Sequence, residues 1–350
     1  MIAAVFEQGS GFSVCDVPIP EIGPDDLLVR VEASAICGTD LRVVKNGQRK
    51  LTNGDRVVLG HEFTGVVEKA GARQAAHFPE GVRIGVAPNI GCGRCRMCAM
   101  ALPNMCPDYR AYGINIDGAH AEYVRVVGDS IQQGSVMRLP EGVSPEAAAL
   151  IEPLSCVVNG SRSVRIGLGD RVVIFGAGPI GLFHVMLARN AGASLAAVVE
   201  AMPHRLEAAA AFGADLCIDA REGDVVERIL AATDGEGADA AITACSVASV
   251  QQQALELLAP LGRVCLFGGL PKGASAAPLD TNLIHYKNLV VTGMTGGAPA
   301  DFRCALNLTV SGRIDVTRVI SHRYPIAEVG AAYDAALRGE GMKIVLEGSA

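Results

Sequence analysis

Hydrophobic and polar positions follow two different patterns along the chain, and the pattern changes near residue 155. Before that point, short apolar or alternating runs separated by Gly and Pro predict β-strands, most clearly over 27–34, 63–67 and 121–127. The first helix that we expect covers 144–150, where a serine suits the N-cap and a proline follows it. This part of the chain is therefore predicted to be β-rich.

After residue 155, apolar strand-like runs alternate with Ala-rich helical runs. Such alternation predicts a doubly wound parallel sheet, so the expected fold class is α/β. The chain ends with a predicted helix, 327–337, and a predicted strand, 343–347. The predicted strands of the alternating part are 172–175, 196–199, 216–218, 240–243, 264–267 and 289–292, and the predicted helices are 180–191, 205–212, 225–231 and 250–259.

Composition narrows the class of protein. Half of the 350 residues are hydrophobic and 19% are charged, so the chain is expected to fold, with room for two domains. The net charge of −7 argues against a nucleic-acid partner. The longest nearly apolar stretch, 171–189, is too short to span a membrane and contains a histidine. Without a signal peptide, the eleven cysteines suggest metal ligands in a cytoplasmic protein.

A glycine-rich motif follows the first strand of the alternating part. Gly176, Gly178 and Gly181 form the G-x-G-x-x-G pattern that binds a dinucleotide pyrophosphate at a helix N-terminus. Glu200 ends the next predicted strand, where a carboxylate accepts hydrogen bonds from the ribose of NAD and repels the extra phosphate of NADP. Arg205 lies nearby and could instead bind that phosphate, so NADP is the alternative cofactor.

Four cysteines lie within fifteen residues. Their C-x2-C-x2-C-x7-C spacing matches a closed tetrahedral zinc site, which has no position open to substrate. An iron–sulfur cluster is the alternative, although the ferredoxin run has only three residues before its fourth cysteine. The predicted ligands of this structural zinc are Cys92, Cys95, Cys98 and Cys106.

A second candidate metal site has mixed ligands. Cys37, His61, Glu62 and Glu152 offer one thiolate, one imidazole and two carboxylates, the ligand types of a catalytic zinc with an open position. His61 and Glu62 are neighbours, and in an extended strand neighbours point to opposite faces. Either the backbone bends there or one of the two carboxylates is not a ligand, and the sequence leaves both possibilities open.

The order of these features resembles the zinc-dependent medium-chain dehydrogenase family along essentially the whole chain. The features are C-G-T-D, G-H-E, the four cysteines, E-P and the glycine motif. The resemblance implies a GroES-like catalytic domain, 1–155 and 290–350, with a structural zinc lobe at about 88–110. A Rossmann domain, 156–289, is implied to bind NAD, with the active site in the cleft between the two.

The segment Glu152-Pro-Leu-Ser-Cys156 is similar to the sorbitol and polyol dehydrogenase branch. The resemblance also assigns residues. It makes Cys37 and His61 ligands of the catalytic zinc, with Glu62 or Glu152 as the third, and makes Thr39 the hydroxyl that relays the substrate proton. The implied cofactor contacts include Pro179 and Ile180 of the glycine motif, together with Glu200 and Arg205.

We therefore expect oxidation of a secondary hydroxyl of a polyol, sugar acid or cyclitol to a ketone, with NAD as the hydride acceptor. Many relatives have a histidine near Thr39, where this chain has Leu41 and Arg42. A guanidinium does not accept protons near neutral pH, so the proton would leave through a ribose hydroxyl or water. The alternatives are a threonine or simple secondary alcohol dehydrogenase and a non-enzymatic NAD-binding sensor. The resemblance further implies a homodimer or homotetramer.

Overall fold

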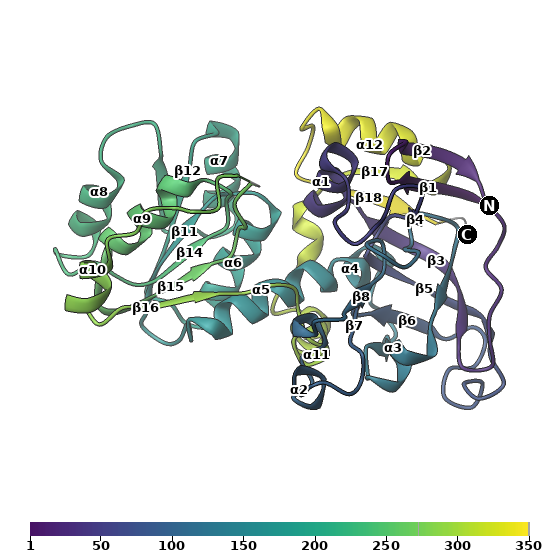
Figure 1. Cartoon of the computed structure of the whole chain (residues 1–350). Coiled ribbons are helices and arrows are strands. Elements are labelled where there is room, and N and C mark those ends of the chain that lie inside the picture. The colour runs from purple at the N-terminus through teal and green to yellow at the C-terminus, as the bar shows by residue number, and fades with distance from the viewer. Residues whose placement is uncertain (272, 349–350) are drawn as a thin grey trace. The chain divides into compact units, whose positions relative to one another are not determined.

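The computed structural model describes residues 1–271 and 273–348, and the chain divides into two compact units (Figure 1). Unit 1 comprises Met1–Ser155 and Gly296–Ala350, and unit 2 comprises Cys156–Thr295. The second boundary therefore lies at 295/296 rather than near 290. The physical reason is that β16 (Val290–Gly293) pairs with β15 (Leu258–Leu266) and so continues the sheet of unit 2.

Unit 1 is built on mainly antiparallel sheets, with β17 and β18 pairing in parallel. Its largest sheet has the strand order β10-β6-β5-β3-β18-β17, with β9 also pairing with β3, and a second sheet has the order β2-β1-β4. Apolar side chains from both sheets and from the last helix form the buried cores. The strands are β1 (Ile2–Glu7), β2 (Gly11–Asp16), β3 (Leu27–Ala35), β4 (Arg56–Val58), β5 (Glu62–Ala70), β6 (Arg83–Val86), β7 (Asn89–Ile90), β8 (Arg110–Ala111), β9 (Tyr123–Val126), β10 (Val136–Arg138), β17 (Ile320–Pro325) and β18 (Lys343–Glu347).

Unit 1 also contains helices that the hydrophobic pattern does not predict before residue 144. The most important of them for function is α1 (Gly38–Asn46), whose short length and paired valines hide its periodicity. The predicted N-cap of α4 is confirmed, because the Ser144 hydroxyl accepts from the backbone N–H of Ala147. The other helices of this unit are α2 (Arg96–Ala99), α3 (Gly128–Gln132), α4 (Pro145–Ala149), α11 (Pro299–Val310) and α12 (Val329–Leu337), and α5 (Ile151–Ser163) crosses into unit 2.

Unit 2 has a single parallel sheet with the strand order β13-β12-β11-β14-β15-β16. The α/β fold class predicted from the alternation is confirmed. Its central strands, β11, β12 and β14, are largely buried and rich in Val, Ile and Ala, as expected where helices cover a parallel sheet, whereas the edge strands β13 and β16 are more exposed. The remaining elements are β11 (Arg171–Phe175), β12 (Leu195–Glu200), β13 (Leu216–Asp219), β14 (Ala238–Thr243), α6 (Pro179–Asn190), α7 (Pro203–Ala211), α8 (Val225–Ala232), α9 (Ala248–Glu256) and α10 (Thr281–Tyr286). No helix of the described residues is long and apolar enough to cross a membrane.

Candidate metal and cofactor sites

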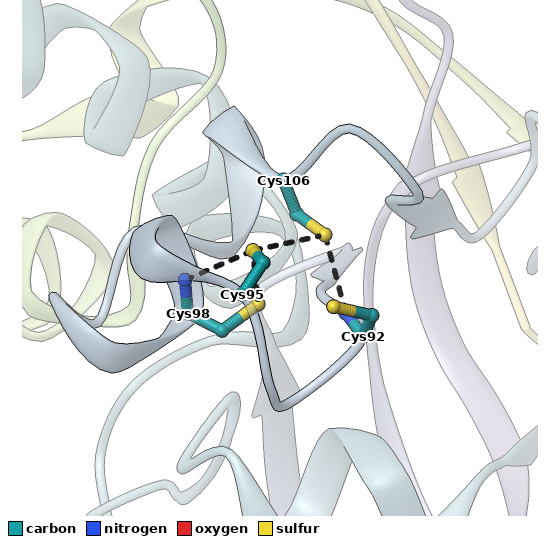
Figure 2. A group of neighbouring side chains, drawn as sticks. All are labelled: Cys92, Cys95, Cys98 and Cys106. Carbon is teal, nitrogen blue, oxygen red and sulfur yellow. Dashed lines mark hydrogen bonds between the residues drawn. The ribbon is translucent and has the colours of Figure 1, made fainter.

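The four predicted cysteines converge on one point, with their sulfur atoms within 4.8 Å of one another (Figure 2). The Sγ atom of Cys95 lies 3.5 Å from that of Cys98 and 3.7 Å from that of Cys106. These distances exclude disulfides, in which the sulfurs are about 2.05 Å apart. A tetrahedron with metal–sulfur bonds of about 2.3 Å has edges of about 3.8 Å, so the group fits a single zinc ion. It leaves no room for the irons and sulfides of a cluster.

The backbone prepares this group for metal binding. Hydrogen bonds from the backbone N–H groups of Arg94 and Cys95 lower the pKa of Cys92 to about 6, which favours the thiolate that binds metals. Burial raises the pKa of Cys98, a cost that a bound cation would offset. Gly91 was not singled out from the sequence, yet a Cβ atom there would lie 2.3 Å from the Cys98 sulfur. A side chain at that position would displace a ligand.

The second group contains Cys37, His61 and Glu62, whose ligand atoms also lie within 4.8 Å of one another. Cys37 is the N-cap of α1, and Glu62 is the first residue of β5. The backbone does bend before the strand, because Gly60 has a φ of +97° and His61 precedes β5. A Cβ atom at Gly60 would also lie 2.3 Å from the ring of His120, so glycine is required there.

Asp40 fixes the two nearest ligands. Its carboxylate is fully buried, accepts a hydrogen bond of 2.8 Å from the backbone N–H of Cys37, and lies 3.4 Å from Nδ1 of His61. Nε2 of His61 is thereby left for a metal ion. Burial disfavours the charge on His61, but Asp40 and Cys37 outweigh it and raise the pKa of His61 well above its usual value. Groups that attract a proton so strongly also attract a metal cation.

Glu62 is paired with a buried lysine. The Nζ atom of Lys343 lies 2.5 Å from Oε2 of Glu62, and both side chains are almost fully buried. With Cys37 as thiolate and His61 neutral, as metal binding requires, the group holds three negative charges, from Cys37, Asp40 and Glu62, against the single positive charge of Lys343. A divalent cation makes this buried set neutral, so the residues fit zinc by charge as well as by ligand type.

The other predicted residues of this site have separate positions. Glu152 lies in the first turn of α5, is 6% exposed and is not a member of the three-ligand group. Thr39 lies in the first turn of α1, two residues after Cys37. Its hydroxyl oxygen accepts a hydrogen bond of 3.2 Å from Nη2 of Arg42.

The glycine motif has the geometry of a dinucleotide site. Gly176 follows β11 with a φ of +98°, and a Cβ atom at Gly181 would lie 1.9 Å from the carbonyl oxygen of Gly176. A Cβ atom at Gly178, the N-cap of α6, would meet no other atom within 4 Å. The space beside this residue is therefore open, as a closely approaching phosphate requires. Glu200 ends β12 and accepts a hydrogen bond of 2.8 Å from the N–H of Ala177 inside the motif. The motif residues 176–181, Pro179 and Ile180 among them, therefore form one loop and the start of α6.

Sequence reasoning gave no role to Asp40, Gly60, His120 or Lys343. One signal could have pointed to Lys343, because a lysine heads an otherwise apolar strand, Ile344–Leu346. No comparable feature of the sequence indicates His120, because it comes close to Gly60 only in the folded structure.

Comparison with known proteins agrees with this geometry. Residues 179–311 match the zinc-binding dehydrogenase family, and residues 23–141 match the alcohol dehydrogenase GroES-like domain. An alcohol dehydrogenase of Cupriavidus necator is 32% identical, over 95% of this chain and 94% of that protein. An L-threonine 3-dehydrogenase of Rhizobium etli is 29% identical over the same shares.

A solved structure is also similar to this chain over almost its whole length. A protein of Sinorhizobium meliloti 1021, inferred to be a zinc-binding dehydrogenase and bound to NADP, is 35% identical. It superposes with a TM-score of 0.90, covering 99% of this chain and 98% of its own. The chain is an oxidoreductase that belongs to the zinc-dependent medium-chain dehydrogenases.

Proposed function

We propose that the protein oxidises a secondary hydroxyl of a polyol, sugar acid or cyclitol to a ketone, with NAD as the acceptor. A secondary alcohol and NAD⁺ are converted to a ketone, NADH and one proton. The observation that carries the proposal is the convergence of Cys37, His61 and Glu62, which forms a mixed and incomplete ligand set. When bound, zinc stabilises negative charge on an oxygen atom and NAD accepts a hydride.

The chain's own residues would bind the alcohol and move its proton. In this proposal the hydroxyl of Thr39 accepts the substrate proton, since it lies in the same helical turn as Cys37. Arg42 already donates to Thr39 and cannot accept a proton, so the proton continues to a ribose hydroxyl or to water. Arg42 thus places a fixed positive charge beside the hydroxyl that handles the proton, which favours the deprotonated alcohol.

Among the three substrate classes, we propose the sugar acids first. Arg42 and Lys45 follow Thr39 at intervals of three on the exposed face of α1, and Arg49 follows the helix. No acidic residue occurs from 41 to 54. Within the described part of the chain, no carboxylate lies within 4.0 Å of these three cations, whose guanidinium and ammonium groups suit a carboxylate.

A substrate panel tests the function and the substrate class together. Matched neutral and acidic compounds, such as alditols and the corresponding aldonates, would be compared by the appearance of NADH absorbance. We expect a higher kcat/KM for the acids, and Arg42→Ala should raise KM for the acid while leaving KM for NAD unchanged. A raised KM for NAD alone would assign Arg42 to a cofactor phosphate. Reduction of NAD by L-threonine or simple secondary alcohols only would favour the alternative dehydrogenase.

We propose NAD rather than NADP because of Glu200. Its carboxylate is held by the N–H groups of Ala177, Ala201 and Met202, and Arg205 lies 4.0 Å away. A 2′-phosphate would face this fixed negative charge. We expect NAD to be preferred by about 10²-fold in kcat/KM and Glu200→Ala to reduce that preference. Equal use of both cofactors by the unchanged protein would contradict the assignment.

A further inference from the structure

Lys343 is a buried cation at the centre of unit 1. It is the first residue of β18 and is 6% exposed. Strand β18 pairs antiparallel with β3, with Val345 opposite Ala35, so Lys343 lies where β3 ends and the segment carrying Cys37 begins. A lysine is rarely buried unless its charge is balanced by a partner.

The ammonium group bridges the two segments that carry metal ligands. Its Nζ atom donates a hydrogen bond of 3.0 Å to the carbonyl oxygen of Ile36, the residue before Cys37. The same atom lies 2.5 Å from Oε2 of Glu62. Lys343 therefore fixes the Glu62 carboxylate relative to the Cys37 backbone without belonging to the metal-ligand group itself.

The carboxylate of Glu62 consequently has two possible cationic partners. The ion pair with Glu62 and the hydrogen bond to Ile36 hold the lysine in place as an ammonium group beside this carboxylate. Negative charge that Glu62 shares with Lys343 is not fully available to a metal ion, because both cations draw on one carboxylate.

We propose that Lys343 is a positioning residue that competes with the metal ion for the Glu62 carboxylate. The ammonium weakens the hold of Glu62 on the metal, so the ion stays exchangeable and strongly electrophilic. The inference rests on the proposed role of the Cys37, His61 and Glu62 group as the catalytic zinc site.

Removal of the lysine charge tests the competition without any substrate. We expect Lys343→Met to release its catalytic zinc to a chelator about 10-fold more slowly than the unchanged protein, which corresponds to about 1.4 kcal/mol. In the cobalt-substituted protein the visible absorption should weaken, because a firmer carboxylate ligand raises the coordination number. Lys343→Arg keeps the charge, so its zinc release and its cobalt absorption should be those of the unchanged protein. Lys343→Gln, which is neutral but can still donate to Ile36, should behave as Lys343→Met.

A matched control tests whether the loss of any lysine that donates to the backbone has the same effect. Lys287 donates to the backbone carbonyls of Glu256 and Leu258 and lies outside both metal groups. Lys287→Met should therefore leave zinc release unchanged. Equal or faster zinc release in both Lys343→Met and Lys343→Gln would overturn the competition, and so would an unchanged cobalt spectrum.

Thermal stability gives a second reading if Lys343→Met folds poorly. Without metal, Glu62 in this variant is a buried charge that has lost its ion-pair partner, so Tm should fall, and zinc should raise Tm by more than it does in the unchanged protein. An equal fall in Tm with and without zinc would mean that the lysine has only a structural role. Because these readings need no substrate, they can fail while alcohol oxidation stands. An inactive substrate panel would refute the proposed function and leave them untouched.

Discussion

At the scale of single residues, the metal group is a balance of buried charges. The carboxylate of Asp40 has no exposure at all, yet burial is outweighed by the charge and hydrogen bonding of His61, which bring its pKa to about 2. The carboxylate of Glu62 forms an ion pair with the buried ammonium group of Lys343. Burying one of these charges without its partner would cost free energy. Each charged side chain therefore requires its partner to lie beside it.

Matched substitutions can show which of the two carboxylates, Glu62 or Glu152, binds the catalytic zinc. We expect Glu62→Gln to lower the affinity for the catalytic zinc by more than about 100-fold, because it removes the charged ligand of the three-residue group. Glu152→Gln should keep two zinc ions per chain, since Glu152 is outside that group. Elemental analysis after dialysis measures both, and the four-cysteine zinc is the internal reference. Loss of zinc from Glu152→Gln alone would reverse the assignment.

Thr39 is expected to act on the proton rather than on binding. Removal of its hydroxyl in Thr39→Ala should lower kcat by roughly 10²-fold, the range that general acid–base groups contribute. KM for NAD should stay within about twofold, and Thr39→Ser, which keeps the hydroxyl, should retain most of the activity. Steady-state kinetics with the best substrate of the panel provide the measurement. A Thr39→Ser variant as impaired as Thr39→Ala would show that the methyl group, not the hydroxyl, matters.

At the scale of elements, the parallel sheet of unit 2 could be predicted because each strand is an apolar run bounded by Gly or polar residues. The β12 prediction, 196–199, differs from the observed strand by one residue at each end. Helix α1 could not be predicted in this way, since its buried face contains only Asp40 and Val43. Its position depends on the hydrogen bond from the Cys37 N–H to Asp40, which is a property of the site rather than of hydrophobic periodicity.

The sequence alone also could not decide whether Glu62 or Glu152 is the third metal ligand. It depends on the bend at Gly60, and a glycine by itself does not indicate which φ it adopts. The four-cysteine group, by contrast, needed no tertiary information, because its ligands lie within one short segment and their spacing is sufficient.

Helix α6 carries a histidine that makes unit 2 sensitive to acid. His184 is fully buried, its Nε2 atom has no hydrogen-bond partner in the described residues, and its ring packs edge-on against Phe267. Burial lowers the pKa of His184 to about 3, whereas in the unfolded chain it is about 6.5. Between these values the unfolded chain binds a proton that the folded chain does not, so stability falls as the pH falls.

The expected size of this effect follows from the two pKa values. Between pH 7.5 and pH 5.5, His184 should remove about 1.4 kcal/mol from the free energy of unfolding. We expect His184→Leu to lack this contribution, so that its unfolding free energy falls by that much less over the same interval. Urea unfolding followed by circular dichroism at the two pH values measures the difference. Identical pH dependence in both proteins would mean that His184 is protonated, or accessible to protons, in the folded state.

At the scale of the whole molecule, the eleven cysteines divide into different chemical roles. Four form the closed group around Cys95, one belongs to the mixed group, and the others are single thiols such as Cys15. A closed tetrahedral site contributes directly to folding, because its loop has little core of its own. A mixed site with an open position exchanges its ion more readily.

The two zinc ions should therefore leave the protein at different rates. We expect two zinc ions per chain, of which mild chelation removes one, abolishing activity while circular dichroism still reports a cooperative fold. Cys95→Ser should instead lower the soluble yield, since it opens the closed site, and Cys15→Ser should leave both yield and zinc content unchanged. The physical cause is the number of thiolate ligands, four in one group and one in the other. Elemental analysis that finds one zinc ion in the fully active protein would contradict the two-site assignment, and so would the retention of full activity after one ion has been removed.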